Sequence, residues 1–169
     1  MVVLGEGTPQ DRAYLPLATR RRNPIRNMTR MELSPLTMRS AVEKYLNDYP
    51  RAKLRSATSV YNCMGLVFGS RRTWIFPDQL TKILTDDEYK KLSGPEEVEI
   101  GDVVIYHDEE GRPNHIGVVT DKSFNAQLNP IITVTSQWGA AGEYIHPVDG
   151  APEFYGRRVE YWTDRRPKP

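Results

Sequence analysis

The chain has 169 residues, of which 38% are hydrophobic and 27% are charged, and its formal net charge is +1. This length fits one domain with one buried core, and the small net charge provides no overall field for binding nucleic acid or an anionic membrane. The single cysteine excludes an intramolecular disulfide and a cysteine-rich zinc site.

The sequence contains no apolar run that approaches the roughly 18 residues of a membrane helix. Its first residues, MVVLGEGTPQDR, have neither the basic region nor the apolar stretch that is typical of a signal peptide. We therefore expect a cytoplasmic protein with no membrane partner. Export by a route without a cleaved signal stays open.

Residues 1–36 are expected to form an extended basic arm, because they are rich in Arg, Pro and Thr and lack sustained periodicity. The arm contains five closely spaced arginines: Arg20, Arg21, Arg22, Arg26 and Arg30. Such a run suggests nucleic-acid binding as one hypothesis. Most short basic runs are solvated, however, so nucleic acid is not the expected partner.

The next part of the chain predicts short helices. Spacings of three and four positions give the first helix one apolar face, which consists of Met38, Val42, Tyr45, Leu46 and Tyr49. Pro50 ends this helix, and residues 62–68 form a second, short one. Pro77 begins another helix, and residues 85–88 read as a fresh helix start.

After Pro95 the pattern changes to strands. Strands are predicted over 103–106, 115–120 and 131–136, with edge strands over 144–146 and 158–162. Because these segments follow one another closely, we expect an antiparallel meander. Helices first and strands later indicate an α+β domain over residues 37–164, followed by a short tail, 165–169.

Cys63 is the first candidate for a functional residue. A thiol at the start of a helix lies near the positive end of the helix dipole and near unpaired N–H groups, which would lower the pKa of the thiol. The competing interpretation is a small buried hydrophobic residue, since cysteine is among the most buried residue types.

His115 is the candidate base, because it opens the strand over 115–120 and would face a helix N-terminus across the sheet. Of the other two histidines, His107 is expected at the surface, and His146 would either cap the site or brace a turn. One cysteine and three histidines give no spacing typical of a metal site, so no metal is expected.

A catalytic histidine also needs a polar partner, and the strand over 131–136 offers Ser136 or Gln137, which point to opposite faces. An oxyanion would be stabilised by the N–H of Cys63 together with a donor from Asn62, Tyr61 or Ser59. Asn62 would serve equally well as a helix cap. Trp138 is expected near the mouth of the same site.

Three segments together resemble the NlpC-type branch of the papain-like cysteine peptidases, which includes the CHAP amidases. They are Asn62-Cys63-Met64-Gly65-Leu66, then Gly101-Asp102-Val103-Val104-Ile105-Tyr106 with Asn114-His115-Ile116-Gly117-Val118-Val119, and then Ile132-Thr133-Val134-Thr135-Ser136-Gln137-Trp138-Gly139. The segment from Tyr144 to Gly156 resembles a small bacterial subgroup of such domains.

This resemblance implies a papain-like fold of the NlpC type, with N-terminal helices packed on a small antiparallel sheet of about five strands. It also implies a cysteine hydrolase, a peptidase or amidase, that attacks an amide of a peptide or protein through Cys63 and His115 without a cofactor. Acyl transfer or deamidation of a protein would use the same groups. The alternative from another class is a catalytically inactive binding module.

Overall fold

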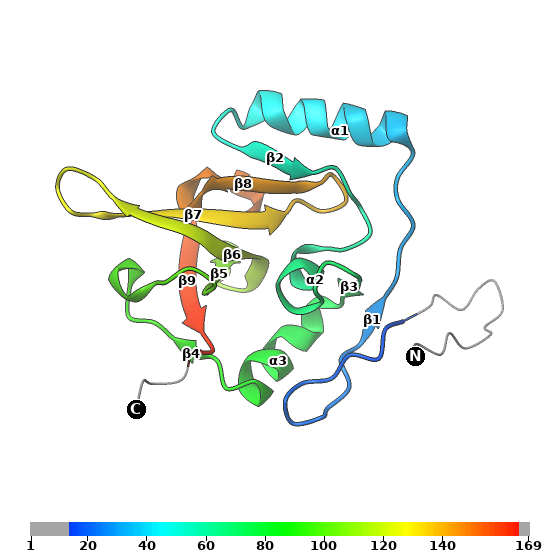
Figure 1. Ribbon diagram of the computed structural model, residues 1–169, viewed down its shortest axis with the longest axis horizontal. Helices are drawn as coiled ribbons and strands as arrows, with labels where there is room; N and C mark the ends of the chain where they lie inside the picture. Colours follow the sequence, from blue (N-terminus) through cyan, green and yellow to red (C-terminus); the bar gives the residue numbers. More distant parts are fainter. Residues whose placement is uncertain (1–13, 166–169) are drawn as a thin grey trace.

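The computed structural model describes residues 14–165, and its centre is an antiparallel sheet of seven strands (Figure 1). The strand order across the sheet is β2-β8-β7-β6-β5-β9-β4. The strands are β2 (Lys53–Ser56), β4 (Lys90–Lys91), β5 (Val103–His107), β6 (Pro113–Phe124), β7 (Pro130–Gln137), β8 (Glu143–Pro147) and β9 (Arg158–Thr163). A second sheet pairs β1 (Asn27–Met28) with β3 (Trp74–Ile75).

The middle of the large sheet separates two hydrophobic clusters, and strand register decides which residues enter each. Ile105 of β5 lies opposite Ile116 of β6, and both belong to the cluster that packs against the helices. The next pair, Tyr106 and His115, points to the other face, because successive side chains of a strand alternate. Tyr106 belongs to the second cluster, with Val134.

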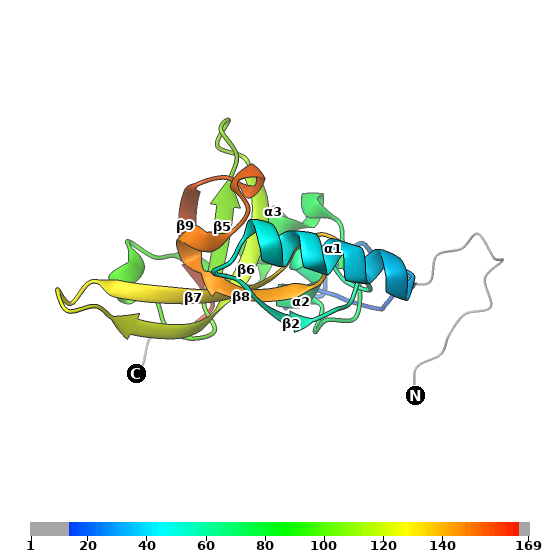
Figure 2. The same ribbon diagram turned by 90° about the horizontal axis from the view of Figure 1, so that it is seen from above.

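The helices are α1 (Pro35–Asp48), α2 (Cys63–Phe68) and α3 (Leu80–Asp86), with 3-10 turns η1 (Pro77–Gln79), η2 (Pro95–Glu97), η3 (Val148–Gly150) and η4 (Glu153–Tyr155). Ser34 caps α1 by accepting the N–H of Thr37. Helix α1 runs along β2 at one edge of the sheet, as both views show (Figures 1 and 2). Tyr45 of α1 packs against Trp138, with ring centroids 5.3 Å apart.

Most of the predicted elements are confirmed. The first two helices are α1 and α2, and the third begins as η1 at Pro77 and continues as α3. The five predicted strands are β5 to β9. The helix start predicted over 85–88 is wrong: α3 ends at Asp86, and Glu88 has a φ of 61° that turns the chain out of the helix towards β4.

The predicted papain-like, NlpC-type arrangement of helices on a small sheet of about five strands is also wrong. The domain is mostly β, with seven strands in the main sheet, two more in a second sheet, and three short α-helices. The additional strands carry little sequence signal. The exposed β2 has the sequence KLRS, and β1, β3 and β4 have two residues each, so alternation cannot reveal them.

Residues 14–36, the described part of the predicted arm, are anchored to the domain, whereas residues 1–13 lie outside the described part. The last two residues of this predicted arm belong to α1, which begins at Pro35. Strand β1 pairs with β3, and the hydroxyl of Thr19 donates to the carboxylate of Asp86 at 2.8 Å. At the other end, Arg165 binds Asp102 at 2.7 Å, and residues 166–169 of the predicted tail lie outside the described part.

Candidate functional site

Cys63 is the first residue of α2, and the cap that precedes it fixes where this helix begins. The side-chain oxygen of Asn62 accepts the N–H of Gly65 at 2.8 Å and that of Ile75 at 3.1 Å, while its amide nitrogen donates to the Ile75 carbonyl at 2.8 Å. Helix α2 is therefore tied to β3. Gly65 permits this contact, since a Cβ there would lie 1.7 Å from the carbonyl oxygen of Thr73.

The sulfur of Cys63 lies beside the backbone of β6. The backbone N–H groups of Ile116, Met64 and Cys63 itself lie near it and favour the thiolate. Burial nevertheless raises the pKa of the thiol to about 11, because desolvation outweighs these three donors. The lowering expected from the helix terminus is therefore wrong, and α2, with six residues, is too short to offset the burial.

His115 is buried on β6, and its ring lies flat against the ring of Tyr155 in η4. The two ring centroids are 3.7 Å apart and the planes meet at 12°. Within the described part of the chain, residues 14–165, the Nε2 atom of His115 is buried without a hydrogen-bond partner. Burial, followed by the nearby His146, lowers the pKa of His115 well below its usual value, so the imidazole is neutral at pH 7.

Cys63 and His115 line the same small pocket, which has a volume of about 50 Å³. Its other walls come from α2, from Pro77 and Leu80, and from the start of β6, where Asn114 and Ile116 lie. The pocket has room for one or two water molecules or a group of similar size, such as a carbonyl. The fold thus places the two residues that the sequence suggested as nucleophile and base in the wall of one pocket, whereas within residues 14–165 no hydrogen bond joins the Cys63 sulfur to the His115 ring.

The two candidate partners of His115 are bound elsewhere. Ser136 accepts the indole N–H of Trp138 at 3.0 Å and lies 2.8 Å from Nε2 of His146. Gln137 donates to the carbonyl oxygen of Thr58 at 2.7 Å. Within residues 14–165, no hydrogen bond joins either side chain to His115.

His146 belongs to a short buried chain of hydrogen bonds. Because the Pro147 carbonyl can only accept, Nδ1 of neutral His146 carries the proton and donates to it at 2.8 Å. Nε2 of His146 therefore accepts the hydroxyl of Ser136, which in turn accepts the indole N–H of Trp138. Burial lowers the pKa of His146 to about 4, although the bond to Pro147 and the charge of Asp149 act in the opposite direction. This chain braces β7 against β8.

A buried carboxylate, which the sequence did not single out, lies behind α2. Glu143 opens β8 and is fully buried; it accepts Arg55 at 2.7 Å, Arg71 at 2.9 Å and the hydroxyl of Tyr61. Burial alone would raise the pKa of Glu143, but the hydrogen bonds from Arg71 and Tyr61 and the charges of Arg71 and Arg55 lower it. The one sequence feature that could have identified Glu143 is its position as a glutamate at the start of a largely apolar strand.

The proposed oxyanion and substrate residues already have partners within the protein. Asn62 caps α2, Tyr61 binds Glu143, and Trp138 and His146 bind Ser136. The donors close to the sulfur are backbone N–H groups. The sequence analysis did not identify Tyr155 as a site residue. No local sequence pattern marks it, because its contact with His115 depends on how η4 packs against β6.

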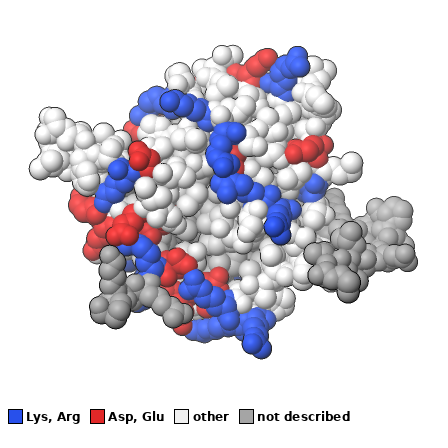
Figure 3. All heavy atoms as spheres, viewed as in Figure 1, with Lys and Arg blue, Asp and Glu red and all other residues white. Residues whose placement is uncertain are grey.

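Several arginines of the predicted arm are also bound to the domain. Arg20 pairs with Asp164, Arg26 pairs with Asp78 at 2.7 Å, and Arg30 lies over the Trp74 ring, 4.1 Å from its centroid. Figure 3 shows both acidic and basic side chains on one face of the molecule, so no single sign covers it. These contacts reduce the charge that the arm offers to a phosphate backbone.

Within residues 14–165, no group of three or more His, Cys, Asp or Glu side chains is placed to hold a metal ion. No helix in the same range is long and apolar enough to cross a membrane.

The family to which this chain belongs is described as a domain of unknown function, DUF7689. The family model matches residues 53–163, which extend from the start of β2 to the end of β9 and include Cys63, His115, Glu143 and Tyr155. No curated protein and no solved structure matches the chain.

Proposed function

We propose that this protein is a cysteine hydrolase that cleaves an amide bond of a peptide or protein through a thioester on Cys63. One observation carries the proposal. Cys63 and His115 line the same pocket, and the sulfur of Cys63 lies near the N–H of Ile116, the residue after His115. Within residues 14–165, Nε2 of His115 is a buried polar atom without a hydrogen-bond partner, which supports a role in chemistry.

The first half of the reaction is acyl transfer to sulfur. The sulfur bonds to the carbonyl carbon as a ring nitrogen of His115 takes the thiol proton, and the carbonyl oxygen gains the negative charge. When this intermediate collapses, the carbon–nitrogen bond breaks, and the imidazolium returns the proton to the leaving amine. The N–H groups of Cys63, Met64 and Ile116 are the nearby donors for the oxyanion.

The second half releases the acyl group. His115 takes a proton from water, the water oxygen bonds to the thioester carbon, and the carbon–sulfur bond breaks as the sulfur regains a proton. A carboxylic acid leaves and the thiol is restored. If an amine takes the place of water, the same steps produce acyl transfer, and if the substrate is a side-chain amide, they produce deamidation.

The two shifted pKa values decide the order of proton transfer. The thiol, with a pKa of about 11, and the buried imidazole are both neutral at pH 7. An ion pair is therefore not the resting state, and His115 must take the proton as the sulfur attacks. General-base catalysis of this kind contributes about 10²- to 10⁴-fold to a rate.

The test measures acetylation of Cys63 by p-nitrophenyl acetate, followed by intact mass and by release of p-nitrophenol. Because the chain has one cysteine, a Cys63→Ala variant removes the only thiol. We expect Cys63→Ala to abolish the adduct and His115→Gln to slow acetylation at pH 7 by about 10²-fold or more. His107→Gln is the matched control, since His107 is also a buried histidine of the central sheet.

Acetylation at the same rate in His115→Gln and in the unmodified protein would contradict the proposal, as would the absence of an adduct on Cys63. Either result would favour the second candidate, a non-catalytic binding module. The raised pKa of Cys63 is the observation that supports this alternative. A module of this kind would show slow alkylation by iodoacetamide that rises with pH as for an isolated thiol, with no contribution from His115.

A further inference from the structure

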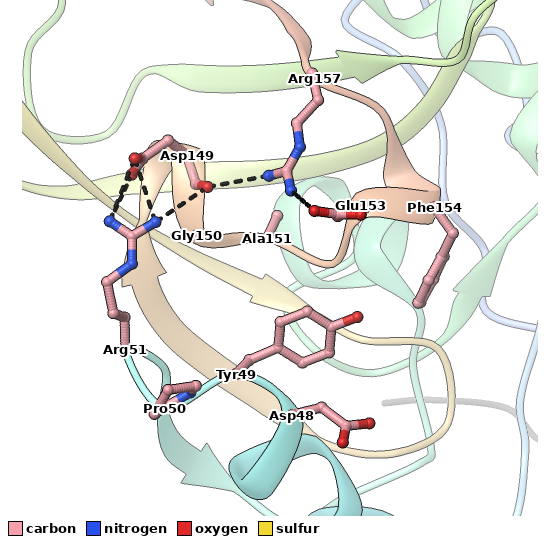
Figure 4. Close-up of a pocket in the computed structure, with 10 residues that line it drawn as sticks. All are labelled: Asp48, Tyr49, Pro50, Arg51, Asp149, Gly150, Ala151, Glu153, Phe154 and Arg157. Carbon is pink, nitrogen blue, oxygen red and sulfur yellow. Dashed lines mark hydrogen bonds and ion pairs between the residues drawn. The ribbon is translucent and has the colours of Figure 1, made fainter.

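A hollow lies where the end of α1 faces the loop between β8 and β9. It has a volume of about 620 Å³ (Figure 4). The pairs Arg51–Asp149 and Arg157–Glu153 line it together with the rings of Tyr49 and Phe154, and the Asp48 carboxylate lies beside Tyr49 (Figure 4). We call the two ion pairs the charged part of the hollow and the two rings its aromatic part.

The charged part is occupied with internal bonds. Arg51 binds both carboxylate oxygens of Asp149 at 3.2 Å, and Arg157 binds the main-chain carbonyl of Asp149 and the carboxylate of Glu153. These bonds hold the loop that carries η3 and η4. An anionic ligand would have to displace a carboxylate from an arginine, so the charged part does not favour one.

The aromatic part is open, and the ring of Tyr155 packs against both Phe154 and His115. Phe154 is 59% exposed although it lies in a hollow. Its ring is 4.4 Å from that of Tyr155, and the Tyr155 ring is 3.7 Å from that of His115, measured between centroids. The carbonyl of Phe154 also accepts the side-chain N–H of Asn114 at 2.7 Å, and Asn114 lines the Cys63 pocket.

We infer that the hollow between Tyr49 and Phe154 is a subsite for an aromatic side chain of the substrate, next to the amide that Cys63 attacks. This inference rests on the proposed function for its role in catalysis, although the binding itself does not require turnover. An aromatic ring between these two side chains would bury the exposed face of Phe154 and stack on it. A methyl side chain would leave that face in contact with water.

The test compares two probes, N-acetylphenylalaninamide and N-acetylalaninamide, by NMR titration of the full-length Cys63→Ala variant, which cannot react with them. We expect the phenylalanine amide to bind about tenfold more tightly than the alanine amide, as for a ring that enters a hydrophobic pocket. Phe154→Ala should reduce this preference to about threefold or less, because the stacking surface is lost.

Phe124→Ala is the matched control, since Phe124 is exposed to a similar extent, 57%, but lies on β6 outside the hollow. It should keep the full preference. Equal affinity for the two amides, or a preference that survives Phe154→Ala, would overturn the subsite. A preference that depends on Phe154 without any acetylation of Cys63 would keep the subsite and remove the hydrolase.

Discussion

Two groups of polar side chains lie near the segment that carries α2. They differ in how completely their polar atoms are hydrogen-bonded. Glu143 is bound by two arginines and a tyrosine, and Tyr61 of this group is two residues before Cys63. In the second group, the Cys63 thiol has a raised pKa and, within residues 14–165, Nε2 of His115 has no partner.

We interpret the group around Glu143 as part of the scaffold, and the pocket of Cys63 and His115 as the candidate site. A buried charge that is fully hydrogen-bonded holds its neighbours in place, whereas an unpaired buried polar atom lowers stability and is retained where it serves a function. In residues 14–165 three other buried side-chain atoms lack a partner, on His107, Gln137 and Trp162. An unpaired atom is therefore insufficient evidence alone, and it is the pocket shared with Cys63 that singles out His115.

The largest effect on stability is expected from disrupting the hydrogen-bonded group around Glu143. Glu143→Gln removes the charge that pairs with Arg71 and Arg55, and we expect the free energy of unfolding to fall by about 3 kcal/mol. This value is at the lower end of the range for breaking a buried ion pair, because both arginines are partly exposed. Urea denaturation measures this change. Glu153→Gln is the control: its side chain is 81% exposed, and its loss should change stability by about 0.5 kcal/mol or less. Equal effects of the two variants would refute the scaffold role.

A smaller effect is expected from the buried chain of hydrogen bonds at His146. Its pKa is lowered to about 4, so the unfolded chain binds the proton more tightly, and stability that is present above pH 6.5 is lost as the pH falls towards 4. Between pH 7.5 and 5 this single group should reduce the free energy of unfolding by about 2 kcal/mol.

Urea midpoints at several pH values measure this loss. His146→Gln cannot titrate, so its stability should fall less between pH 7.5 and 5 than that of the unmodified protein. If both proteins lose the same stability over this range, His146 is not buried in the neutral form that the hydrogen bonds to Ser136 and Pro147 require.

The smallest expected effect is a gain of stability at the pocket of Cys63 and His115. It tests the comparison between the two groups most directly. His115→Phe removes the unpaired Nε2 and keeps a ring against Tyr155, so we expect the free energy of unfolding to rise by about 1 kcal/mol while acetylation of Cys63 is lost. His107→Phe should not stabilise the protein. His107 lies 3.7 Å from the Glu160 carboxylate, and the substitution would remove this neighbour of the carboxylate. Destabilisation by His115→Phe would show that the imidazole serves the fold.

Local patterns in the sequence predicted much of the secondary structure. The apolar face of α1, the cap at Asn62 and the apolar strands β5 to β7 all depend on residues within a few positions of one another. The papain-like arrangement failed because it depended on how many strands join the sheet. Short, exposed strands such as β2 and β4 join through backbone hydrogen bonds, which the side-chain pattern does not reveal.

The candidate site divides in the same way. The sequence alone selected Cys63 and His115, because there is one cysteine, there are three histidines, and each chosen residue was expected to begin a regular element. Cys63 does begin α2, whereas His115 is the third residue of β6. Only the tertiary structure decided the rest: the Ile116 N–H near the sulfur, the Tyr155 ring on His115, and the pKa values that burial shifts. Composition and periodicity are properties of neighbouring residues, whereas burial and pairing depend on segments that meet only when the sheet closes on α2 and on the loop that follows β8.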